Sequence, residues 1–164
     1  MLNLKIESVD VKTFMNTLLT SEIFDFFEVR GVDITTITHF NISGQKILPD
    51  SANDSSDLPE KASKAEYCKW SEIRPFVFNI IKGGTRPSHM KIIFSMESAE
   101  VNKLHENGAA MYLNIQYGGE EIYFTSATAQ KGFSLDKSLD HVWEDYLKEF
   151  FMANKIKAKE IEME

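Results

Sequence analysis

The stretch MYLNIQYGGEEIYFT, residues 111–125, gives the clearest structural signal in the chain. Apolar and polar residues alternate on both sides of Gly118-Gly119, as is typical of two antiparallel strands with one buried face. Two glycines between such strands favour a two-residue hairpin turn. Pairing Tyr117 with Glu120 makes one face of the hairpin fully apolar, so the register supports itself. The stretch therefore predicts a β-hairpin.

The rest of the chain divides into segments with helical or strand periodicity. In order, we expect a strand over 4–6, a helix capped by Asp10, two or three antiparallel strands between 23 and 48 with turns at Gly31 and Ser43-Gly44, a helix within 64–82, a strand over 90–96, a short helix over 98–107 and a helix from Ser138. Because the helices lie between antiparallel runs and do not alternate with single strands, the fold class is α+β. We expect an antiparallel sheet, or two, with helices packed on one face.

The 164 residues suffice for one domain with a sizeable core, which we place at 1–154. Residues 49–61 offer almost nothing to bury and predict a flexible acidic loop. Residues 155–164 form a charged tail that we expect to fray. Cys68, the single cysteine, excludes an internal disulfide framework and a cysteine-based zinc cluster. No apolar stretch approaches the roughly 18 residues of a membrane-spanning helix, and the N-terminus has no signal-peptide core, so we expect a cytoplasmic protein with no membrane partner.

Charge is distributed unevenly along the chain, whose net charge is −7. The window from Lys61 to Lys91 holds seven basic and two acidic residues, whereas the remaining residues hold eleven basic and 23 acidic ones. Such a basic island can bind phosphate or an acidic partner, or can pair with carboxylates of the same protein. The candidate phosphate or partner contacts are Lys64, Lys69, Arg74, Lys82 and Arg86.

Two tyrosines of the predicted hairpin, Tyr112 and Tyr123, point away from its apolar face. With Asn114, Gln116 and Thr125 they would form a polar-aromatic sheet face. Such a face suits partner binding or the stacking of nucleic-acid bases. Alternatively, a helix of the same chain covers it.

Several stretches together resemble a known family: FDFFEVRGVDITTITHFNISG, YCKWSEIRPFVFNIIKGG followed by TRPSHMKIIF, MYLNIQYGG, and KGFSLDKSLDHVWEDYL. They are similar to an uncharacterised family of small intracellular proteins from low-GC Gram-positive bacteria, catalogued as a domain of unknown function. The resemblance extends from about residue 3 to 153. It implies a cytoplasmic bacterial protein and brings no activity, cofactor or catalytic residue.

The order of elements is also similar to the repeating unit of DNA sliding clamps. In that fold, paired helices line a basic ring interior and the sheets face outward. The likeness implies two halves, each a helix followed by strands, with the basic residues of the second helix on phosphates. The first helix departs from it, because Lys12 is its only basic residue.

No phosphate-binding loop, dinucleotide fingerprint, metal-ligand set or catalytic triad is present in the sequence, and we expect no cofactor. We therefore expect a non-catalytic binding or interaction protein, whose partner is an unidentified protein or a second copy. The alternatives are a nucleic-acid-associated, clamp-like protein and a small enzyme whose site assembles only in three dimensions.

Overall fold

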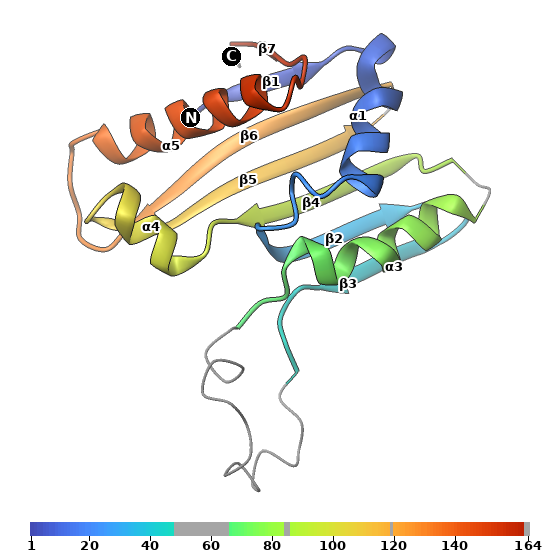
Figure 1. The fold of residues 1–164 in the computed structure, drawn as a ribbon, viewed down its shortest axis with the longest axis horizontal. Helices are drawn as coiled ribbons and strands as arrows, with labels where there is room; N and C mark the ends of the chain where they lie inside the picture. The colour runs from blue at the N-terminus through green and yellow to red at the C-terminus, as the bar shows by residue number, and fades with distance from the viewer. Residues whose placement is uncertain (48–65, 84–85, 119, 163–164) are drawn as a thin grey trace, which may run out of the picture.

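The computed structural model describes residues 1–47, 66–83, 86–118 and 120–162. These residues form a single antiparallel sheet of seven strands, with four helices (Figure 1). The strands are β1 (Asn3–Ile6), β2 (Glu28–Thr35), β3 (His39–Ser43), β4 (His89–Ser95), β5 (Gly108–Gly118), β6 (Glu121–Gln130) and β7 (Lys159–Glu160), and the helices are α1 (Ser8–Thr20), α3 (Trp70–Lys82), α4 (Ser98–Leu104) and α5 (Ser138–Ala153). The strand order across the sheet is β3-β2-β4-β5-β6-β1-β7.

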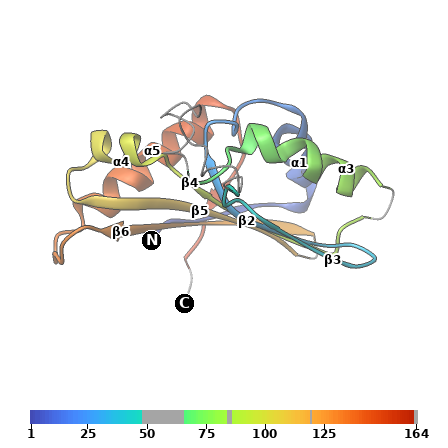
Figure 2. The ribbon, with the colours of Figure 1, turned by 90° about the horizontal axis from the view of Figure 1, so that it is seen from below.

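All four described helices lie on one side of the sheet (Figure 2). The other side, which we call the open face, carries no helix of the described residues. This arrangement confirms the α+β class and the prediction that helices pack on one face. The loop predicted over 49–61 lies outside the described residues.

The core lies between the sheet and the helices. One row of the sheet, read across β2, β4, β5, β6 and β1, consists of the buried residues Val32, Ile92, Ile115, Phe124 and Leu4. Phe94 is fully buried beside this row, and its ring packs against those of Phe24, Phe27 and Trp70. The indole nitrogen of Trp143 on α5 donates to the carbonyl oxygen of Tyr112 at 2.8 Å, which fixes α5 against β5.

The hairpin is confirmed, but its predicted register is wrong by two residues. Tyr117 pairs with Ile122, and Gly118 pairs with Glu121. A shift of two keeps every side chain on its predicted face, because the side-chain period of a strand is two. Apolar patterning alone therefore cannot separate the two registers.

Four local predictions also need correction. Asp10 lies in the first turn of α1 and does not cap it, because α1 already begins at Ser8. Gly31 is not a turn but lies inside β2, next to a register shift against β4. The predicted helix over 98–107 ends at Leu104. The tail does not fray throughout, because its residues 159–160 pair with β1 as strand β7.

Candidate functional site

The open face contains the polar-aromatic surface that the sequence predicted around Tyr112 and Tyr123. Strand register aligns its side chains in rows that run across the strands. One row contains Asp33, Lys91, Gln116, Tyr123 and Lys5, and the next contains Gly31, Ile93, Asn114, Thr125 and Asn3. None of the described helices covers these rows, so the alternative that a helix of the same chain lies over them does not hold for the described residues.

Two shallow hollows lie on the open face, one on each side of Gln116 and Tyr123. The larger, of about 390 Å³, is lined by Asp33, His89 and Lys91 besides these two residues. The smaller, of about 310 Å³, is lined by Asn3, Thr125 and Ile161, among others. The face is thus a hollowed surface of polar and aromatic groups, without the depth of an enclosed active site.

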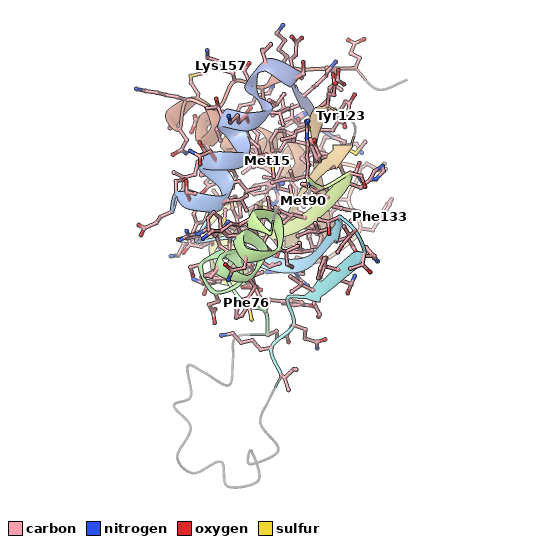
Figure 3. The ribbon with its side chains drawn as sticks, turned by 90° about the vertical axis from the view of Figure 1, so that its right-hand side faces the viewer. Met15, Phe76, Met90, Tyr123, Phe133 and Lys157 are labelled. Atoms are coloured by element: carbon pink, nitrogen blue, oxygen red, sulfur yellow. The ribbon has the colours of Figure 1, made fainter. Side chains whose placement is uncertain are left out.

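Tyr123, whose side chain is labelled in Figure 3, lines both hollows and is held by its neighbours. Its hydroxyl donates to the Glu121 carboxylate, which also pairs with the Lys5 ammonium at 3.1 Å. The hydrogen bond to Glu121 raises the pKa of Tyr123, and the hydrogen bonds from Tyr123 and Lys5 lower the pKa of Glu121. The hydrogen bond to Glu121 therefore fixes the orientation of the Tyr123 side chain on the open face.

Tyr112 belongs to a second cluster of the open face, around Arg30. The Arg30 guanidinium lies 3.8 Å from the ring centroid of Tyr67 and 5.5 Å from that of Tyr112. Its Nε donates to the hydroxyl of the buried Ser95 at 3.0 Å. Burial raises the pKa of the nearby Glu28 carboxyl, although the Arg30 charge acts in the opposite direction.

The two tyrosines do not form a common stacking platform. Along the strand direction Tyr112 and Tyr123 are two rows apart on neighbouring strands, which corresponds to roughly 13 Å.

Sequence reasoning missed Arg30 as a residue of the site. Its surroundings come from three other segments of the chain, which contribute Tyr67, Ser95 and Tyr112. The break in polar-apolar alternation at Arg30-Gly31 was the one local sign of the irregularity in β2.

The predicted basic residues do not form one patch in the described part of the chain. Lys64 lies outside the described residues. Lys69 pairs with Glu97 at 3.4 Å, and Arg74 makes two hydrogen bonds to the Asp25 carboxylate, at 3.0 and 2.9 Å. These two cations thus contact carboxylates of the same protein, which is the alternative that the sequence left open.

The other two members of the basic island contact aromatic side chains. Lys82 Nζ lies 5.7 Å from the ring centroid of Phe78, and Arg86 Nε donates to the hydroxyl of Tyr117 at 3.2 Å. Both side chains lie on or near the end of α3, away from Lys69 and Arg74 at its beginning. Neither cation pairs with a carboxylate of the described residues, which makes both of them candidates for contact with an anionic ligand.

Further chemistry of the described residues is limited. No group of three or more His, Cys, Asp or Glu side chains among them is placed to hold a metal ion. Cys68 is a free thiol whose pKa is raised by burial and by the nearby Glu72 carboxylate, which disfavours the nucleophilic thiolate. Within the same residues, no helix is both long and apolar enough to cross a membrane.

Family comparison agrees with the resemblance seen in the sequence. Residues 17–159 match the model of DUF5721, a family of unknown function. No curated protein and no solved structure matches the chain significantly, so neither the Gram-positive source nor the clamp likeness gains support from relatives. Since the family model covers most of the sequence, the chain belongs to DUF5721.

Proposed function

We propose that this chain is a non-catalytic binding protein that contacts another protein through the open face of its sheet, and that a second copy of the chain is such a partner. The observation that carries the proposal is the open face itself. All described helices cover the opposite side (Figure 2), yet the open face has two hollows and aromatic groups that are held by their neighbours.

The residue types of the open face suit a protein interface. Tyrosine and arginine are the residues that interface hot spots favour, and Tyr123, Tyr112 and Arg30 are all held in place by neighbours. Ile93 adds a half-buried apolar side chain between them. Because these side chains are already ordered, binding loses less conformational entropy there than on a mobile surface.

The charge of the open face favours a second copy. Strands β1, β2, β4, β5 and β6 contribute three cations, Lys5, Arg30 and Lys91, and three carboxylates, Glu28, Asp33 and Glu121. The whole chain carries −7, so two copies repel each other through most of their surfaces. Across this balanced face the repulsion is smallest, and a two-fold axis can place cations opposite carboxylates.

The size of the open face is also adequate. The same five strands, about 4.8 Å apart and paired over four to ten residues at about 3.4 Å each, cover roughly 24 by 24 Å. That patch is of the order of the ~800 Å² per partner that a specific interface buries.

Sedimentation velocity at low and high protein concentration tests the proposal. We expect a dimer that dissociates on dilution, and Tyr123→Ala should weaken it by about tenfold or more, the effect of one hot-spot side chain. Phe76→Ala is the matched control, since Phe76 is an exposed aromatic on α3, on the other side of the sheet. A chain that stays monomeric at high concentration, or a dimer weakened by Phe76→Ala and not by Tyr123→Ala, would overturn the proposal.

Nucleic-acid association is the alternative that the basic island supports, through Lys82 and Arg86. Fluorescence anisotropy with labelled single- and double-stranded DNA separates it from the proposal, beside the double variant Lys82→Glu/Arg86→Glu. DNA affinity that falls steeply with salt and disappears in the variant would favour the clamp-like alternative.

We also propose that the protein acts in the bacterial cytoplasm. The free thiol of Cys68 is compatible with such a reducing compartment.

A further inference from the structure

A hollow of about 320 Å³ lies on the helix side of the sheet, between α1 and the end of α3. Figure 3 labels Met15 of α1, one of its lining residues. Val11 and Met15 of α1 and Ile81 of α3 form its apolar walls, with Pro87 and Tyr117 beside them. Its volume is at the lower end of the range of small-molecule sites, about 300–1,000 Å³. The hollow is therefore the size of a small ligand and not of a macromolecular surface.

The charge of this hollow differs from that of the rest of the protein. Two cations, Lys12 and Arg86, line it, and no Asp or Glu is among its described lining residues. In a chain with 25 acidic residues, such a lining favours an anion. The larger hollow of the open face, in contrast, pairs the Lys91 cation with the Asp33 carboxylate.

Arg86 is positioned at this hollow by a buried group. Its Nε donates to the hydroxyl of Tyr117, whose side chain is only 5% exposed. This hydrogen bond anchors the guanidinium and leaves its two terminal nitrogens, which have no acceptor among the described residues, to face a ligand. A guanidinium held in this way presents paired N–H groups in the geometry that a carboxylate accepts.

We infer that this hollow binds an amphipathic monocarboxylate, with the carboxylate on Arg86 and Lys12 and an aliphatic or aromatic body against Val11, Met15 and Ile81. At about 30 Å³ for each water-sized group, the volume accommodates roughly ten non-hydrogen atoms. The apolar walls exclude a strongly hydrated body such as a sugar phosphate, because its hydroxyl groups would lose water there without gaining partners.

Isothermal titration calorimetry with octanoate tests the inference. Octanoate carries both the charge and a body of suitable length. Octanol lacks the charge, octylamine reverses it, and inorganic phosphate lacks the apolar body. We expect octanoate to bind most tightly of the four probes. If octanol bound as tightly as octanoate, the hollow would not be an anion site. If inorganic phosphate bound more tightly than octanoate, the apolar walls would not contribute to binding.

Two variants locate the binding site. Arg86→Gln should weaken octanoate by about tenfold or more, the size of a lost charge-assisted hydrogen bond, and Lys12→Gln by less. Lys103→Gln, at an exposed lysine of α4 that does not line the hollow, is the matched control and should bind like the wild type. Octanoate binding that survives Arg86→Gln and Lys12→Gln together, or no binding by the wild type, would overturn the inference.

The octanoate experiment can succeed or fail independently of the proposed dimerisation through the open face. Each variant is checked by thermal unfolding, and Arg86→Lys, which keeps the charge and loses the paired N–H groups, should show intermediate affinity. Because the hollow and the open face lie on opposite sides of the sheet, neither Arg86→Gln nor octanoate should change dimerisation in sedimentation velocity.

Discussion

The two faces of the sheet are built from the same strands, yet their side chains differ in kind. On the helix side, the row from Val32 to Leu4 is apolar and buried throughout. On the open face, the adjacent row from Asp33 to Lys5 holds charges, an amide and a phenol. Neighbours in one strand, such as Phe94 and Ile93, thus belong to two environments.

The difference indicates which features the fold requires. The helix side accounts for the stability of the sheet, because that is where apolar area leaves water. The open face needs only to be polar enough to remain hydrated. Hydration alone does not require ordered tyrosines, a guanidinium stacked on aromatic rings, or hollows. We therefore attribute these features of the open face to binding. The following predictions test this division, from the largest expected effect to the smallest.

Phe94→Ala should cost about 3–5 kcal/mol in the free energy of unfolding, because it removes a fully buried ring from a cluster of aromatic side chains. The matched variant Ile93→Ala, one residue away on the open face, should cost about 1 kcal/mol or less when the chain is monomeric. Urea unfolding followed by tryptophan fluorescence measures both. Equal losses would show that the open face is packed as tightly as the helix side.

Gly44→Ala should cost about 2–3 kcal/mol, because a Cβ at Gly44 would lie 1.6 Å from the carbonyl oxygen of Val29. Gly44 passes closely over the irregular part of β2 that presents Arg30 on the open face. Gly31→Ala, in that same irregular region, meets only an atom at 3.9 Å and should stay within about 0.5 kcal/mol of the wild type. Chemical denaturation of both variants measures the difference, and a well-tolerated Gly44→Ala would contradict the close approach.

These two glycines also show which features the alternation of polar and apolar residues cannot predict. Alternation predicted the strand content around Gly31 and both faces of the hairpin, because the period of apolar residues is local information. It misplaced Gly31 in a turn, because a glycine is a turn signal in sequence, whereas here it lies inside β2 next to a register shift against β4. In the same way, the two hairpin registers bury the same residues, so apolar patterning alone does not distinguish them.

The candidate site was predictable only where its residues follow one strand pair. Tyr123, Asn114 and Gln116 were placed correctly on one face by hairpin alternation. The basic island was a cluster in sequence but not in space, because Lys69 and Arg74 meet carboxylates that come from other segments of the chain. Lys12 joins Arg86 at one hollow although 74 positions separate them, and no local pattern reports such a pairing.

Arg74→Gln should cost about 1–2 kcal/mol, because it breaks a two-pronged, partly buried ion pair with Asp25 on the helix side. Lys69→Gln, which breaks an exposed pair with Glu97, should change stability by about 0.5 kcal/mol or less. Thermal unfolding at low and high salt measures both. An unchanged stability of Arg74→Gln together with lost DNA affinity would instead assign Arg74 to nucleic-acid contact.

Glu28→Gln should give the smallest effect, and its sign depends on pH. Burial raises the pKa of Glu28 in the folded chain above its value in the unfolded chain. The stabilisation linked to protonated Glu28 is therefore complete below the ordinary glutamate pKa of about 4.3, and it is lost as the pH rises through the raised folded value. The variant should thus be more stable than the wild type at neutral pH and equal to it in acid.

Glu121→Gln is the control of opposite sign on the same open face. Hydrogen bonds from Tyr123 and Lys5 lower the pKa of Glu121, so its carboxylate contributes stability above the ordinary pKa and loses it as the pH falls. This variant should be less stable than the wild type at neutral pH, and the difference should shrink in acid. Unfolding curves recorded across this pH range separate the two cases. Glu28 is a carboxylate that is only shielded from water, whereas Glu121 is one that hydrogen bonds hold in place. If both variants shifted in the same direction, burial at Glu28 and hydrogen bonding at Glu121 would not be the causes.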